Sequence, residues 1–112
     1  MSERRVVNIA DLPLRETAHG ARFGSRAGRI GGVIGLRKLG GQYFIVPPGK
    51  SAFPFHAHFG NEEIYFILEG EGTYRLGGET FPVRAGDLMA APAGGAETAH
   101  QLTNTGTGDL RY

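Results

Sequence analysis

Short apolar runs, cut at close intervals by glycine and proline, make up most of the chain after residue 30. Residues 30–39 and 42–46 are rich in β-branched and aromatic side chains and are separated by Gly40-Gly41, which predicts two strands joined by a turn. The same pattern of short apolar runs bounded by glycine or proline recurs in four later segments, 63–72, 73–83, 87–92 and 97–104. Turn signals at roughly 8- to 12-residue intervals are typical of an antiparallel sandwich or barrel. We therefore predict an all-β fold with little or no helix.

A hairpin is indicated by Gly77-Gly78, which separates the strand-like segments 73–76 and 79–83. Glycine adopts positive φ without strain, as the loop of a two-residue hairpin requires. Pro82 has no N–H to donate to a neighbouring strand. We therefore predict that it lies at a sheet edge or at a bulge.

The first 29 residues have a different character. Residues 6–14 contain two short apolar stretches that fit either a strand or a single helical turn, and residues 20–28 are polar, basic and glycine-rich, which predicts a loop or a mobile arm. His19 stands alone among polar residues, and we expect it to be solvated. We divide the chain into an N-terminal strand with a glycine/arginine-rich arm, 1–29, and a β-barrel, 30–112, within a single domain.

Composition limits the class of protein. The 112 residues suffice for one domain with a modest core. The 19 glycines and 6 prolines occur beside 40% apolar residues, so they indicate turns rather than disorder. There is no cysteine, which excludes disulfides and thiolate metal sites. Since no apolar run is long enough to span a bilayer and the start does not resemble a signal peptide, we expect a soluble, cytoplasmic protein without a membrane partner.

The net charge of +1 conceals an asymmetry. Residues 1–50 carry nine Lys/Arg and three Asp/Glu, a surplus of six, whereas residues 51–112 carry three and eight, a deficit of five. The arginines of the first half lie among glycines without a recognition helix or an aromatic stacking pattern, so we expect no nucleic-acid partner. Mutual neutralisation of the two halves is the simplest explanation, and attraction of an anionic substrate is an alternative.

The clearest candidate chemistry lies between residues 48 and 63. His56 and His58 are two positions apart, so they share one face of an extended strand. The carboxylates Glu62 and Glu63 follow after a short turn, and neighbours on a strand face opposite ways, which excludes a paired-carboxylate glycosidase site. Two imidazoles and one carboxylate are ligand types of a metal site.

Two motifs resemble those of the cupin superfamily. The first consists of Gly49, six residues, His56-Ala57-His58, four residues, Glu63, six residues and Gly70. The second consists of Gly86, five residues, Pro92-Ala93-Gly94, His100 and Asn104, and it follows the first after fifteen residues. Two spacings depart from the family's usual form. The first glycine-to-histidine gap is one residue longer, and five residues, Gly95 to Ala99, rather than the usual two, precede His100.

The resemblance implies a jelly-roll barrel with a site for a divalent transition metal ion, such as zinc, manganese, iron or nickel. The implied ligands are His56, His58, Glu63 and His100. The apolar alternation of Ile64, Phe66 and Leu68 favours Glu62 as the inward carboxylate, whereas the motif spacing selects Glu63. With Glu63 facing inward beside Tyr65 and Ile67, the apolar row faces outward and needs cover from another segment or subunit. We therefore predict a homodimer.

Two functions fit these residues. The first is a metal-dependent enzyme, such as a dioxygenase, isomerase, epimerase or decarboxylase, that acts on a small polar metabolite. On this hypothesis Tyr65, Thr98 and Asn104 orient the substrate, although barrel filling is an equally good role for them. The second is a non-catalytic sensor or binding module for a sugar or an organic acid, with a structural metal, because a fold alone does not decide function. Similar proteins usually continue beyond the position of Tyr112, so a second subunit or further residues are expected to complete the barrel.

Overall fold

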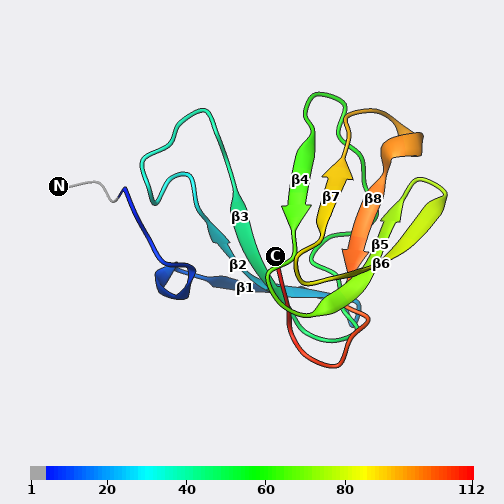
Figure 1. The fold of residues 1–112 in the computed structure, drawn as a ribbon, viewed down its shortest axis with the longest axis horizontal. Helices are drawn as coiled ribbons and strands as arrows, with labels where there is room; N and C mark the ends of the chain where they lie inside the picture. The colour runs from blue at the N-terminus through cyan, green and yellow to red at the C-terminus, as the bar shows by residue number, and fades with distance from the viewer. Residues whose placement is uncertain (1–4) are drawn as a thin grey trace.

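The computed structural model describes residues 5–112, which form antiparallel strands in two layers (Figure 1). The first layer is a four-stranded sheet in the order β1-β2-β3-β9. Its strands are β1 (Arg15–His19), β2 (Phe23–Arg29), β3 (Gln42–Val46) and β9 (Leu110–Arg111). The second layer contains a three-stranded sheet, β6-β5-β8, and the strand pair β4-β7. Its strands are β4 (Glu63–Phe66), β5 (Glu71–Leu76), β6 (Glu79–Arg84), β7 (Leu88–Ala91) and β8 (His100–Thr103).

The hydrophobic core lies between these layers. Val46 of β3 and Leu110 of β9 are fully buried, and they share one cluster with Tyr74 of β5, Met89 of β7 and Leu102 of β8. Period-two alternation along each strand directs these side chains inward. A smaller cluster on the outer face of β3 consists of Leu12, Tyr43 and Ile45. The predicted all-β antiparallel fold is confirmed, and within residues 5–112 the helical elements are two 3₁₀ turns, η1 (Ile9–Asp11) and η2 (Ala96–Thr98).

The predicted hairpin is present between β5 and β6. Leu76 pairs with Glu79 across the two-residue loop, and Gly77 has a φ of 57°, as a tight hairpin requires. Pro82 lies in β6, at the edge of its sheet, where its missing N–H costs no ladder hydrogen bond. This prediction is therefore confirmed.

Two expectations for the N-terminal third are wrong. Residues 30–39 form turns rather than a strand, because the chain folds back on itself through hydrogen bonds such as that from Leu36 N to Gly31 O, 2.8 Å. Residues 23–29, expected in a loop or arm, form β2 between β1 and β3. The glycines of this strand allow close packing: a Cβ on Gly28 would lie 2.8 Å from Pro13 O. The division of the chain at residue 29 stays a prediction.

The outer face of the β4-β7 pair is apolar and exposed. Ile64, Phe66 and Leu68 have exposed fractions of 74%, 46% and 42%. Leu88, which pairs with Phe66 across the ladder, is 67% exposed. Ile67 is fully buried and Tyr65 is half-buried. The outward row that follows from an inward Glu63 is thus present. Within the described part of the chain, no helix is long and apolar enough to cross a membrane.

Candidate metal centre

Two of the predicted ligands are joined directly through their backbones. His56 N donates to His100 O at 3.1 Å, and His100 N donates to His56 O at 2.7 Å. This antiparallel bridge connects the loop that follows β3 to the start of β8. His56 and His100 therefore have a fixed separation, and their ring centroids lie 4.6 Å apart.

The structure brings together all four predicted ligand residues. One ligand atom from each of His56, His58, Glu63 and His100 can be chosen so that all lie within 4.8 Å of one another. Glu63 Oε1 is 3.5 Å from His58 Nε2 and 3.6 Å from His100 Nε2. The His58 and Glu63 side chains are 35% and 39% exposed, whereas that of His100 is fully buried. The group could hold a metal ion, with one side open to solvent.

Hydrogen bonds to backbone carbonyls determine which ring nitrogen faces the centre. His56 Nδ1 lies 2.8 Å from Pro54 O, and His100 Nδ1 lies 3.0 Å from Thr98 O. A carbonyl oxygen can only accept, so each Nδ1 carries the proton and each neutral ring keeps a lone pair on Nε2. Such carbonyl contacts are the usual support of metal-binding histidines.

His100 Nε2 is the clearest sign of a missing partner. It is a buried side-chain nitrogen with no hydrogen-bond partner, although buried polar atoms nearly always have one. The atom lies beside the Glu63 carboxylate, within the group of four. A divalent metal ion would satisfy this lone pair, so the donor set fits the ion that the sequence predicts.

The lengthened loop before His100 has a clear structural role. Its residues form η2, closed by Ala99 N donating to Ala96 O at 3.2 Å. Thr98 Oγ1 donates to Gly95 O at 2.9 Å, and the Thr98 carbonyl accepts the bond from His100 Nδ1. The extra residues thus build the turn that orients the His100 ring.

The three predicted substrate-orienting residues lie in different surroundings. The Tyr65 ring centroid is 5.8 Å from that of His100, so this side chain lies against the centre. Thr98 is occupied within η2. Asn104 is fully buried, its Nδ2 donates to Val46 O and to Gly108 O, and its Oδ1 accepts from Gly106 N. These bonds favour the structural role for Asn104, and substrate contact by the three residues stays a prediction.

Two tyrosines that the sequence did not single out complete the inner wall. The Tyr74 and His100 ring centroids are 6.4 Å apart, and those of Tyr112 and Tyr65 are 5.6 Å apart. Burial, and then the Glu63 carboxylate, raises the pKa of Tyr74 to about 12. Burial also raises the pKa of Tyr65, with smaller contributions from Glu63 and Tyr74. These phenols are therefore neutral near pH 7, and no local signal in the sequence places them at the site.

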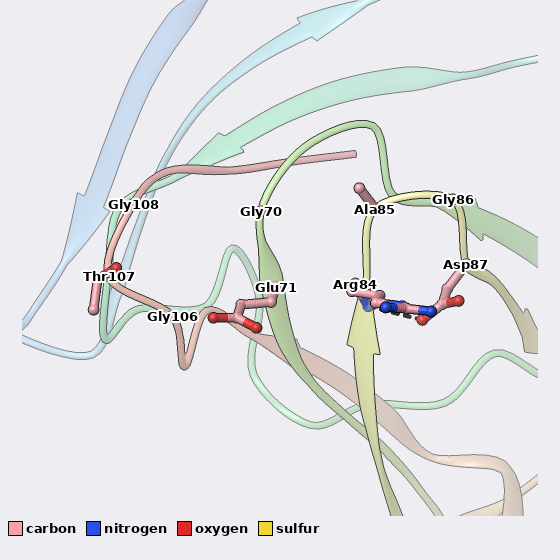
Figure 2. Close-up of a pocket in the computed structure, with 9 residues that line it drawn as sticks. All are labelled: Gly70, Glu71, Arg84, Ala85, Gly86, Asp87, Gly106, Thr107 and Gly108. Atoms are coloured by element: carbon pink, nitrogen blue, oxygen red, sulfur yellow. Dashed lines mark hydrogen bonds between the residues drawn. The ribbon is translucent and has the colours of Figure 1, made fainter.

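A separate hollow lies where β5 begins, β6 ends and β7 begins, which are the strand ends away from the histidine group. Figure 2 shows the residues that line it. Its volume is about 620 Å³, and Glu71, Arg84 and Asp87 are its charged lining residues. Asp87 Oδ2 accepts from the Arg84 backbone N at 2.7 Å, which closes the turn before β7. None of its lining residues belongs to the histidine group.

Comparison with known families gives the same result as the motifs and the fold. Residues 42–112 match the cupin domain family. The chain belongs to the cupin family. The match begins at β3 and includes the four residues of the candidate centre.

Relatives of this cupin include a protein named "Oxalate-binding protein" from Thermotoga maritima. It is 40% identical over 67 residues, which is 60% of this chain and 52% of the relative. An uncharacterised protein of Methanocaldococcus jannaschii is also 40% identical over 67 residues, covering 60% of this chain and 50% of the relative. The aligned region thus spans about half the length of these two relatives.

Solved structures show the same barrel. A structure reported as a "predicted oxalate decarboxylase" from Thermotoga maritima superposes with a TM-score of 0.79 at 28% identity, covering 95% of this cupin and 92% of that chain. A structure reported as a sugar phosphate isomerase from Silicibacter pomeroyi gives a TM-score of 0.81 at 22% identity, covering 95% and 71%. Because the Silicibacter pomeroyi structure is only 22% identical, its similarity shows a shared fold and nothing more.

Proposed function

We propose that this cupin binds a divalent transition metal ion through His56, His58, Glu63 and His100, and acts there as an enzyme on a small polar metabolite. The observation that carries this proposal is the buried, unpartnered His100 Nε2 beside Glu63. Zinc, manganese, iron and nickel all suit imidazole and carboxylate ligands. A bound ion of this kind supplies a Lewis acid that polarises the oxygen atoms of a ligand.

The residues of the chain define which ligands fit. Three neutral imidazoles and one carboxylate only partly neutralise a divalent ion, so the centre keeps a net positive charge that favours an anionic oxygen ligand. Access is from the side of His58 and Glu63, which are partly exposed. The inner wall is aromatic, with Tyr65 against His100, and it excludes water from that side of a ligand. A small organic acid is therefore our preferred ligand class.

The second candidate function is non-catalytic binding of such an acid, with the metal as a structural part of the site. It is favoured by the relative that is named for binding oxalate. It requires the same four ligand residues, so it differs from the first candidate only in whether the ligand is transformed.

Metal-dependent ligand binding tests the proposal and separates the two candidates. Protein stripped with a chelator and reloaded in turn with zinc, manganese, iron and nickel is titrated with oxalate by calorimetry, and products are then analysed by mass spectrometry. We expect binding of oxalate by the loaded protein and loss of binding after removal of the metal. Product formation with any of the four metals supports the enzyme, whereas binding without turnover supports the binding module. Equal binding of oxalate by stripped and loaded protein would contradict both.

We also propose that the outer face of β4-β7 is covered by a second copy of the chain. Its exposed apolar residues, Ile64 and Leu88 above all, form a continuous row across paired strands, and such rows typically mark interfaces. We expect a dimer by light scattering at micromolar concentration, and Ile64→Lys is expected to weaken it at least about tenfold. Val6→Lys is the matched control, because Val6 is 88% exposed and lies outside this face. A monomeric wild-type protein would contradict the proposal.

A further inference from the structure

The C-terminal residue Tyr112 is held between the two layers by backbone hydrogen bonds. Tyr112 N donates to Phe44 O at 3.0 Å, and Phe44 N donates to Tyr112 O at 2.8 Å. On the other side, Leu68 N donates to Arg111 O at 2.8 Å, which ties the same segment to the residues after β4. Figure 1 marks this end of the chain between β3 and β4. The position of the Tyr112 ring is therefore determined by both layers.

Aromatic stacking extends from Tyr112 to the metal centre. The Tyr112 ring is nearly parallel to Phe44, with centroids 5.1 Å apart and planes at 27°. It is also nearly parallel to Tyr65, at 5.6 Å and 28°. The Tyr65 ring in turn meets the His100 ring edge to face, at 5.8 Å. Tyr65 and Tyr112 thus form an ordered pair of phenols on one wall of the centre.

The hydroxyls of this half-buried pair differ from those of the buried Tyr43 and Tyr74. Tyr74 Oη donates to Ala90 O at 2.8 Å, and Tyr43 Oη accepts from Arg111 Nη1 at 2.9 Å. Among residues 5–112 no side chain or backbone group is hydrogen-bonded to the hydroxyl of Tyr65 or Tyr112. Within residues 5–112 the buried side-chain atom without a partner is His100 Nε2, so the hydroxyls of Tyr65 and Tyr112 are accessible to solvent. Two ordered hydroxyls without a protein partner are available to a ligand.

Both hydroxyls belong to phenols that are protonated near pH 7. Burial is the main cause that raises the pKa of Tyr112, and the charges of Tyr65 and Glu63 add to it. The geometric relation between Tyr65 and Tyr112 is their ring stack, with centroids 5.6 Å apart. A neutral phenol is a hydrogen-bond donor, and its bond to an anionic oxygen is stronger than one to a neutral acceptor.

We propose that Tyr65 and Tyr112 form a paired donor site that recognises the oxyanion group of the ligand at the metal centre. This assignment rests on the proposed function and adds Tyr112 as a specificity-determining residue. The ligand class is a small carboxylate with a second oxygen group for the ion.

The test compares two phenol-to-phenyl substitutions. Tyr112→Phe keeps the stacked ring and removes one free hydroxyl, whereas Tyr43→Phe removes a hydroxyl that is already bonded to Arg111 and lies in the separate cluster on the outer face of β3. Zinc-loaded proteins are titrated with oxalate and with inorganic phosphate by calorimetry, and zinc affinity and Tm are measured in parallel. We expect Tyr112→Phe to weaken oxalate binding about tenfold or more, with zinc affinity unchanged. We expect Tyr43→Phe to lower Tm and to leave oxalate affinity within about twofold.

Each outcome bears on the assignment. Oxalate affinity equal in wild type and Tyr112→Phe would overturn the paired donor site while leaving the metal centre intact. Wild-type protein that binds zinc but neither oxalate nor phosphate would also overturn it, again without affecting the metal ligands. Wild-type protein that binds no zinc would overturn the proposed function together with this assignment. A parallel loss of affinity in Tyr43→Phe would show a general effect of barrel packing and contradict a specific role for Tyr112.

Discussion

Replacing His58 with alanine is expected to lower the affinity for zinc by more than about 100-fold, because loss of a residue that merely supports a ligand already costs about 10- to 100-fold. His58 Nε2 lies 3.5 Å from Glu63 Oε1, within the group of four. Its side chain is 35% exposed, so truncation leaves little cavity in the core and the fold is expected to survive. The measurement is competition calorimetry against a chelator of known affinity, with circular dichroism to verify the fold.

His19→Ala is the matched control for this experiment. His19 lies in β1, a strand whose residues are all exposed, as expected from its isolation among polar residues. The substitution removes the same imidazole at a position outside the group of four. We expect it to leave zinc affinity within experimental error. A similar loss in both variants would mean that zinc binds to histidines in general, and it would contradict a specific centre.

Gly70→Ala is expected to destabilise the fold more than Gly86→Ala does. Gly70 has a φ of 91°, and a Cβ at this position would lie 2.5 Å from Asp109 O and 3.1 Å from Leu110 Cα. Leu110 is fully buried, so the neighbouring backbone has little room to move. The positive φ costs about 1–2 kcal/mol, and overpacking adds about 1–3 kcal/mol. The measurement is the free energy of unfolding from urea denaturation.

Gly86→Ala isolates the cost of the backbone conformation. Gly86 has a φ of 94°, close to that of Gly70, but a Cβ there would meet nothing within 4 Å. We expect the free energy of unfolding of Gly86→Ala to fall by about 1–2 kcal/mol, which is the cost of the positive φ alone. Equal losses in the two variants would show that the contact with residues 109 and 110 is relieved without cost.

The later strands could be predicted from the sequence because apolar alternation and glycine turns agree there. The 76–79 hairpin and the edge position of Pro82 follow directly from local rules. The orientation of β4 could not be predicted from amphipathicity, which alone favours an inward Glu62. Motif spacing selected Glu63, and the structure places Glu63 beside His100. The burial of Ile67 and the exposure of Ile64 follow from that choice.

The N-terminal strands could not be predicted because non-local pairing, rather than local pattern, forms them. All five residues of β1 are exposed, so there is no apolar alternation to detect. The glycines of β2 indicate close approach of other segments, as at Gly24, whose Cβ would lie 3.1 Å from Lys50 Cδ. The stacking of Tyr112 on Tyr65 could not be predicted for a similar reason, since its place depends on the pairing of the last residues with β3.

The most direct test of the central claim is the metal content of the wild-type protein. Protein loaded with zinc, freed of excess metal by dialysis and measured by elemental analysis is predicted to hold one ion per chain, bound by His56, His58, Glu63 and His100. The same measurement on His58→Ala is predicted to give far less than one. A wild-type protein that retains no metal after loading would contradict the account, since His100 Nε2 would then lack the partner that its burial requires.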